Sequence, residues 1–362
     1  MREIRISIAT LVLLLISIGV VMIYSASGMY ALNETGDAAY FLNRHLLFLV
    51  MGFIGLIFMM GIDYQLLRKY AKPLILLAIL LLALVLIPGI GKASFGARRW
   101  FKVGVFHLQP SEFAKLAMLI YVADFLARKK YLIKDFLKGF LPLMMVMGLT
   151  CLLIVKQPDL GSSVLIAIIV LIMIYIAGGR IWHIGLLALL ALPALYYLIA
   201  KVPYRLKRII AFLDPWQDSQ GIGFQLTQSQ IALGSGGLFG LGLGHSKQKL
   251  FYLPAAHTDF ILSIIGEELG LLGTLAVVIL FSIFIWQGVR IAKRISDPFG
   301  YFLCIGIVSL IGLQAVVNIG VSIGAFPTKG LPLPFISYGG SALIFNMMAV
   351  GLLLNISRTQ DL

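Results

Sequence analysis

The chain has 362 residues, of which 60% are hydrophobic and 12% charged, and it carries a formal net charge of +14. Its mean hydropathy of +1.00 is far above what a soluble domain needs to fill a core, which excludes water as its main solvent. The positive residues are scattered between apolar runs and form no block. This pattern excludes a nucleic-acid-binding protein and favours a membrane surface or an anionic lipid headgroup as the partner.

Apolar runs long enough to cross a bilayer recur along the whole chain. About 20 residues of helix cross ~30 Å of hydrocarbon, and these runs lack the alternation of barrel strands. They predict an all-α, polytopic membrane protein, a single transmembrane domain over 1–362, with about ten spanning helices. The predicted spans are 6–25, 45–62, 73–90, 111–127, 139–156, 163–178, 181–200, 259–288, 299–324 and 340–356.

Positive charge in the loops gives a prediction of orientation. An even number of spans places both chain ends on one side, and an excess of Lys and Arg marks the cytoplasmic side. The basic residues on the side of the termini are Arg2, Arg5, Arg68, Lys69, Lys72, Arg128, Lys129, Lys130, Lys134, Lys138, Arg290, Lys293 and Arg294. The protein is therefore predicted to lie in the inner membrane with both termini in the cytoplasm.

The opposite, outward side also carries positive charge, so charge alone orients the protein weakly. These cations are Arg98, Arg99, Lys102, Arg205, Lys207, Arg208, Lys247 and Lys249. Two interpretations stay open: the cations bind an anionic outward substrate, or they snorkel to lipid phosphates.

Two irregular segments lie on the outward side. Residues 201–258 form a long predicted loop, too rich in glycine for a simple helix, which dips into the membrane edge and lines a cavity. Residues 327–341 have a density of Pro and Gly that forbids regular helix.

Acidic residues on apolar spans are costly and usually have a defined role. Glu112 and Lys115 are three residues apart, which predicts a structural ion pair along one helix face. Asp159 is explained by an Asx turn or a helix cap. Glu267 and Glu268 are predicted to be buried hydrogen-bonding groups rather than members of a proton relay.

Asp259 is the sharpest candidate for chemistry because it opens a predicted span on the outward side. An Asp just before an apolar helix is typical of an N-cap, and the pattern alone favours a cap over a catalytic group. A metal site is not indicated, because His257 has no ligand spacing with another histidine and Cys151 and Cys304 lie inside apolar runs. A hard cation such as Mg²⁺ needs few protein ligands and stays compatible with the sequence.

Several stretches together resemble one family, the SEDS proteins of bacterial wall synthesis, and within it the FtsW-type members. They are Gly96-Ala97-Arg98-Arg99-Trp100, Gln109-Pro110-Ser111-Glu112-Phe113-Ala114-Lys115-Leu116-Ala117, Gln157-Pro158-Asp159-Leu160-Gly161, Gly223-Phe224-Gln225, Gly237-Leu238-Phe239-Gly240-Leu241-Gly242-Leu243-Gly244, His257-Thr258-Asp259-Phe260-Ile261, Gly266-Glu267-Glu268-Leu269-Gly270, Pro327-Thr328-Lys329-Gly330 and Ile336-Ser337-Tyr338-Gly339-Gly340-Ser341. They run in family order over nearly the whole chain. One departure is Ala255, where the family pattern often has Glu, and it puts a metal site in doubt.

The resemblance implies a peptidoglycan glycosyltransferase that polymerises lipid II into glycan strands during cell division, with Asp259 as the essential carboxylate and candidate general base. It also implies a class B penicillin-binding protein as transpeptidase partner, beside other division proteins. The candidate substrate-binding residues are Arg98, Arg99, Lys102, Arg205, Arg208, Lys329 and Ser337. The rival interpretations are a lipid II flippase and a non-catalytic scaffold of the division machinery. A division role, a sporulation role and an elongation role remain open from the sequence.

Overall fold

The computed structural model describes residues 1–94, 97–104, 106–201, 203–250, 252–254, 256–328 and 330–359. The helices are α1 (Arg2–Thr35), α2 (Tyr40–Gly61), α3 (Tyr64–Leu84), α4 (Pro110–Lys129), η1 (Lys130–Leu132), η2 (Phe136–Phe140), α5 (Leu141–Lys156), α6 (Leu160–Ile176), α7 (Ile181–Ala200), α8 (Pro203–Leu213), α9 (Phe224–Ser235), α10 (Ile261–Ala292), α11 (Pro298–Ser322) and α12 (Gly340–Thr359). The strands are β1 (Lys92–Ser94), β2 (Ala97–Val103) and β3 (Phe106–Leu108).

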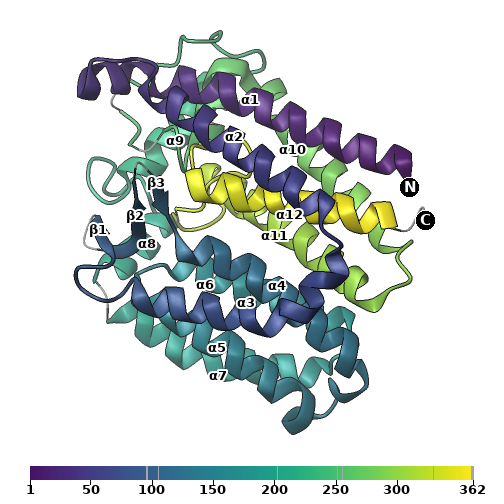
Figure 1. Ribbon diagram of the computed structural model, residues 1–362. Helices are drawn as coiled ribbons and strands as arrows, with labels where there is room; N and C mark the ends of the chain where they lie inside the picture. Colours follow the sequence, from purple (N-terminus) through teal and green to yellow (C-terminus); the bar gives the residue numbers. More distant parts are fainter. Residues whose placement is uncertain are drawn as a thin grey trace.

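The long helices lie roughly side by side in one bundle, as Figure 1 shows. Both termini lie at the right end of this view, and the three strands with α8 and α9 lie at the left end. The segments that connect the helices at the left end therefore share the face opposite the chain ends. This is the arrangement that an even number of spans predicts.

The helical membrane fold predicted from hydropathy is confirmed. Each predicted span falls on one of the long helices, and six helical segments of the described chain are long and apolar enough to cross a membrane. The bounds of the third span were wrong, because α3 begins at Tyr64 and ends at Leu84 rather than covering 73–90. Its start is set by Asp63, whose side chain accepts a hydrogen bond from the Gln65 backbone N–H. The basic residues of its first turns hid this start from a hydropathy reading.

Two parts of the face opposite the termini differ from the prediction. The 201–258 segment is not all loop, because it contains α8 and α9, and its glycine-rich part begins only where α9 ends. The strands β1, β2 and β3 form a three-stranded antiparallel sheet in the order β1-β2-β3, which the sequence analysis did not predict. The candidate cations Arg98, Arg99 and Lys102 all lie on β2.

Small residues set the close contact of α2 with α12. A Cβ atom at Gly52 would lie 2.4 Å from the Met347 sulfur, and one at Gly351 would lie 2.4 Å from the Leu56 carbonyl oxygen. Glycines at such contacts let two helix backbones approach closely. This matters in a membrane, where the hydrophobic effect contributes little to the association of helices. The outer face of α2 stays exposed.

Helix α10 is broken at Gly270, where φ is 68° and ψ is −163°. The glycine-rich segment after α9 packs into this break. The Leu241 and Gly242 N–H groups donate to the Glu267 and Glu268 carbonyls at 2.9 and 3.0 Å, and Leu271 N–H donates to the Gly237 carbonyl at 2.9 Å. Backbone groups freed by a break inside a membrane protein need such partners. The predicted continuous span 259–288 is therefore two helical parts.

Candidate active site

Asp259 lies one residue outside the N-terminus of α10. The helix begins at Ile261 and its N-cap residue is Phe260, which makes no side-chain capping bond. The capping interpretation favoured by the sequence pattern is therefore wrong. The reason is that Phe260, with φ −117° and ψ 24°, separates the carboxylate from the first turn. The Asp259 carboxylate is not used to begin the helix.

The loop that carries Asp259 is fastened to the proline-rich loop by α11. Asn318 Nδ2 donates to the carbonyl of Asp259 at 2.9 Å and to the carbonyl of Leu331 at 2.8 Å. The Tyr338 N–H donates to the His257 carbonyl at 3.0 Å. These bonds hold two irregular segments, far apart in sequence, against each other at a fixed place on the bundle.

The Asp259 carboxylate is partly buried and lies near two guanidinium groups. Burial raises its pKa from the usual value to about 6, while the positive charges of Arg208 and Arg99 oppose the rise. A Cβ atom at Gly330 would lie 3.0 Å from Asp259 Oδ2, so only a residue without a side chain fits there comfortably. A carboxylate with a pKa near neutrality suits a general base.

The two arginines are held by backbone carbonyls. Arg99 Nε donates to the Gln157 carbonyl at 2.7 Å, and its Nη2 also donates to the Pro158 carbonyl. Arg208 Nη1 donates to the Thr328 carbonyl at 2.9 Å. Neutral carbonyl partners fix the position of a guanidinium group without cancelling its charge. Arg99 therefore reaches the site from the sheet, and Arg208 reaches it from α8.

Removing one arginine should change the pH dependence of any reaction in which Asp259 acts as a base. Because the deprotonated carboxylate is the active form, the rate should fall as pH falls through about 6 in the wild type. Arg208→Gln removes a charge that lowers this pKa, so the acid limb should move upward by roughly half a pH unit or more. A pH profile of kcat/KM measures it. Lys207→Gln, an exposed neighbour on the same helix, is the matched control and should leave the limb in place; equal profiles for both variants would contradict the assignment.

The other predicted substrate-binding residues have different surroundings. Arg98 is exposed on β2. Lys102 lines a separate cavity beside α2. Ser337 is buried, and its Oγ accepts a hydrogen bond from the Leu333 N–H at 2.9 Å. That bond closes a turn of the proline-rich loop, so the hydroxyl has a structural partner.

Three positions of interest lie outside what the structure describes. They are Lys329, Ala255 and the side chain of Arg205. Among the described residues, no group of three or more His, Cys, Asp or Glu side chains is placed to hold a metal ion.

The acidic residues on α4 and α6 are absorbed into the structure. Glu112 Oε2 lies 2.7 Å from Lys115 Nζ, and both side chains are buried. Breaking such a pair leaves an uncompensated buried charge, which is strongly destabilising. Asp159 is the N-cap of α6, and its side chain accepts a hydrogen bond from the Ser162 N–H at 3.0 Å.

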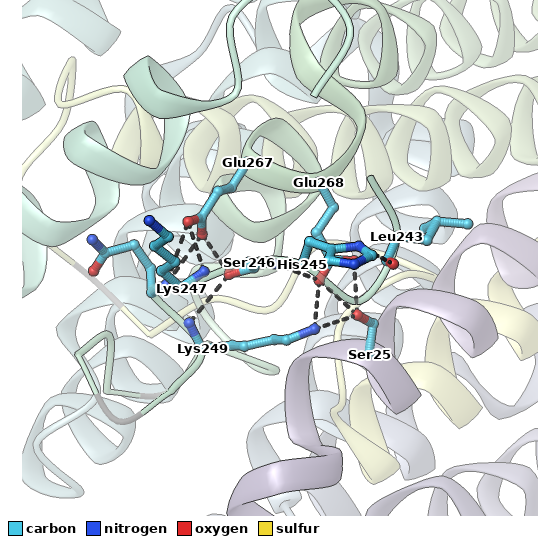
Figure 2. A network of polar contacts seen from close by, with 9 residues as sticks. Ser25, Leu243, His245, Ser246, Lys247, Lys249, Glu267 and Glu268 are labelled. Atoms are coloured by element: carbon cyan, nitrogen blue, oxygen red, sulfur yellow. Dashed lines mark hydrogen bonds and ion pairs between the residues drawn. The ribbon is translucent and has the colours of Figure 1, made fainter. Parts of the chain in front are cut away.

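Glu267 and Glu268 organise a buried polar network beside the break in α10, shown in Figure 2. Glu267 accepts hydrogen bonds from the backbone N–H groups of Lys247, at 2.9 Å, and of Gln248, and from the Ser246 hydroxyl. The carboxylate thereby holds the turn that follows the glycine-rich segment. This is the hydrogen-bonding role expected for it.

Glu268 forms a buried ion pair that the sequence did not predict. Its Oε1 lies 2.7 Å from Lys249 Nζ, and the Ser25 hydroxyl on α1 donates to the same carboxylate at 2.7 Å. The sequence analysis counted Lys249 among the outward cations, but its ion pair with Glu268 neutralises the charge that a substrate would need. No local spacing could have indicated this cluster, because Lys249 lies 19 positions and Ser25 lies 243 positions from Glu268.

The cavity that Lys102 lines is a second feature the sequence missed. It has a volume of about 600 Å³ and lies between α2 and the sheet. Its lining residues are Tyr40, Arg44, Leu47, Phe48, Lys92, Lys102, Gly104 and His107. The lining combines cations with aromatic and aliphatic groups, and none of these described lining residues is acidic.

Comparisons with known proteins identify the family. The cell cycle protein family model that groups FtsW, RodA and SpoVE matches residues 5–362. The probable peptidoglycan glycosyltransferase FtsW of Trichlorobacter lovleyi is 50% identical over 96% of this chain and 91% of its own length. Stage V sporulation protein E of Bacillus subtilis is 46% identical over 96% of this chain and 94% of its own length. The chain belongs to this SEDS family and is of the FtsW type.

Solved structures share the fold over nearly the whole length. A chain from a peptidoglycan synthase complex, studied for its coordination of polymerization and crosslinking, has a TM-score of 0.79 and 27% identity, with 98% of this chain and 97% of that chain covered. The rod shape determining protein RodA of Thermus thermophilus has a TM-score of 0.70 and 26% identity, with 98% and 96% covered. An aspartate-to-alanine mutant of that RodA has also been solved.

Proposed function

We propose that this chain is a peptidoglycan glycosyltransferase that polymerises lipid II into glycan strands during cell division, with Asp259 as its general base. The observation that carries the proposal is the Asp259 carboxylate, with a pKa raised to about 6, beside the guanidinium groups of Arg99 and Arg208. The activity is supported by relatives that are named probable peptidoglycan glycosyltransferases and whose sequences are 50% and 49% identical to this chain.

The proposed reaction needs one carboxylate and several cations. Asp259 takes the proton from the attacking hydroxyl of the acceptor sugar, whose oxygen forms the new bond to the anomeric carbon of the lipid-linked donor. The bond from that carbon to the pyrophosphate breaks, and the polyprenyl pyrophosphate leaves with the electron pair. Arg99 and Arg208 stabilise the charge that develops on it, as a general acid would for a poorer leaving group. Displacement in one step inverts the anomeric carbon.

The membrane orientation follows from this chemistry and from the basic loops. The strand β2 and the helix α8, which carry Arg99 and Arg208, lie at the end of the bundle opposite the termini (Figure 1). If this end faces outward from the inner membrane, both termini lie in the cytoplasm. The chain acts as one transmembrane unit over 1–362. Any Mg²⁺ would be held mainly by the substrate pyrophosphate. A class B penicillin-binding protein supplies the transpeptidase, alongside other division proteins.

Purified protein in neutral detergent, given lipid II with a labelled headgroup, tests the function. We expect lysozyme-sensitive glycan strands, because polymerisation needs no compartments. A flippase would form no polymer in detergent but would move labelled lipid II between the leaflets of sealed vesicles. Translocation without polymer would replace the proposed function by transport, and neither activity would favour a scaffold.

A further inference from the structure

The positive side chains at this end of the molecule fall into two groups, and an aromatic wall borders both. The first group is Arg99 and Arg208, whose charges act on Asp259. The second group is Arg44, Lys92 and Lys102, which line the cavity beside α2 together with His107. The sequence analysis placed Arg99, Lys102 and Arg208 together among the candidate substrate-binding residues, and the structure separates Lys102 from the other two.

The aromatic wall consists of Phe41, His257 and Tyr338. The His257 ring lies 4.7 Å from the Phe41 ring and 5.7 Å from the Tyr338 ring, and Phe41 meets Tyr338 at 5.4 Å. His257 is two residues before Asp259, so the wall borders the carboxylate on one side. It also borders the cavity, because the Tyr338 ring lies 6.5 Å from the ring of Phe48, which lines the cavity.

The second group forms a concentrated positive region. Lys92 Nζ lies 3.1 Å from His107 Nε2 across the sheet. Burial and the charges of Lys92, Arg44 and Lys102 lower the pKa of His107, which keeps its imidazole neutral and leaves three cations around the cavity. Positive clusters of this kind bind phosphate groups through charge-assisted hydrogen bonds.

The cavity also has an apolar exit. Leu47 and Phe48 line it on α2, and Leu47, Val50 and Ile54 are exposed further along that helix. Residues spaced by three and four positions share one helix face. An anion bound in the cavity could therefore keep a long hydrocarbon tail against α2, in the lipid. Free phosphate would make no use of this surface.

We propose that the cavity beside α2 binds the pyrophosphate of a second polyprenyl-linked sugar, the acceptor, while Arg99 and Arg208 bind the pyrophosphate of the donor. The inference rests on the proposed function. A polymerase must hold two lipid-linked substrates at once, and the base must touch the acceptor hydroxyl beside the donor's anomeric carbon. The donor pyrophosphate then lies next to Asp259, and the acceptor pyrophosphate lies one disaccharide away, beyond the aromatic wall.

Equilibrium binding of geranylgeranyl pyrophosphate to the purified full-length chain in neutral detergent tests the inference without catalysis. The wild type should bind two molecules per chain. Lys92→Gln/Lys102→Gln should lose one site or weaken it at least about tenfold, because charged hydrogen bonds are removed. Lys102→Arg, which keeps the charge, and the exposed Lys201→Gln should both retain two. One site in the wild type, or two unchanged sites in Lys92→Gln/Lys102→Gln, would overturn the inference.

Two further measurements separate the inference from its alternatives. A tenfold excess of phosphatidylglycerol should leave the second site occupied; full displacement would mark a bulk-lipid surface and overturn the proposal. Asp259→Asn should still bind two molecules, because this substitution removes none of the cations that bind pyrophosphate. If the wild type binds two but forms no glycan strands from lipid II, the proposed function fails and the cavity remains a polyprenyl-pyrophosphate site without the acceptor role.

Discussion

Asp259→Asn should reduce lipid II polymerisation by about 10²–10⁴-fold, the usual effect of losing a general base. The amide has nearly the shape of the carboxylate but cannot accept the proton from the sugar hydroxyl. Folding should be unchanged, because α10 takes its N-cap from Phe260 and Asp259 does not begin the helix. Polymer yield, thermal unfolding and lipid II binding measured on one preparation give the result.

A matched control for Asp259→Asn is the same substitution at a true capping aspartate. The Asp135 side chain accepts hydrogen bonds from the Leu137 and Lys138 N–H groups, both at 2.9 Å, and lies far from Asp259 in the chain. Because Asn caps about as well as Asp, Asp135→Asn should keep both stability and activity. Polymerisation by well-folded Asp259→Asn at more than about a tenth of the wild-type rate would remove the base assignment.

Gly270→Ala should greatly reduce the yield of folded protein. At φ 68° and ψ −163°, the backbone of Gly270 lies in a region that essentially only glycine adopts. The new Cβ would also lie 2.4 Å from the Gly240 nitrogen and 2.5 Å from the Leu238 carbonyl oxygen. Strain and overlap together should lower the thermal unfolding temperature sharply, because neither contact can relax without opening the break in α10.

Gly234→Ala is the control for this substitution. Gly234 lies in α9, and no atom lies within 4 Å of a Cβ built on it. Alanine in a helix is more stable than glycine by about 0.5–1 kcal/mol, so this variant should unfold at the same or a slightly higher temperature. Similar unfolding temperatures for Gly270→Ala and Gly234→Ala would show that the glycine-rich segment is not packed in the break.

Hydropathy predicted the spans because a helix in lipid satisfies its backbone hydrogen bonds internally. The length and the composition of an apolar run are then sufficient signals. The pairing of Glu112 with Lys115 was also predictable, because i, i+3 spacing alone places them on one face. Local signals failed where long-range packing decides. The break at Gly270 depends on a segment that begins 33 positions earlier, at Gly237.

The candidate site was predictable in part for the same reason. Its carboxylate stood out because an acidic residue at the edge of an apolar run is rare and costly. The sequence assigned the cations to one side of the membrane, but it could not tell which of them lie near the carboxylate. Lys249 is neutralised by Glu268. Lys102 lies in the cavity beside α2 together with Arg44, a residue that the sequence analysis did not single out. Such sorting needs coordinates, because each partner comes from a different helix or strand.

The most direct test of the central claim, that this chain polymerises lipid II at Asp259, uses its complex with the transpeptidase partner in detergent. Penicillin blocks crosslinking, so any product must come from glycosyl transfer. We expect linear, lysozyme-sensitive strands from the wild-type complex and none above background from the complex with Asp259→Asn, at equal lipid II binding. Strands of equal yield from both complexes would contradict the account.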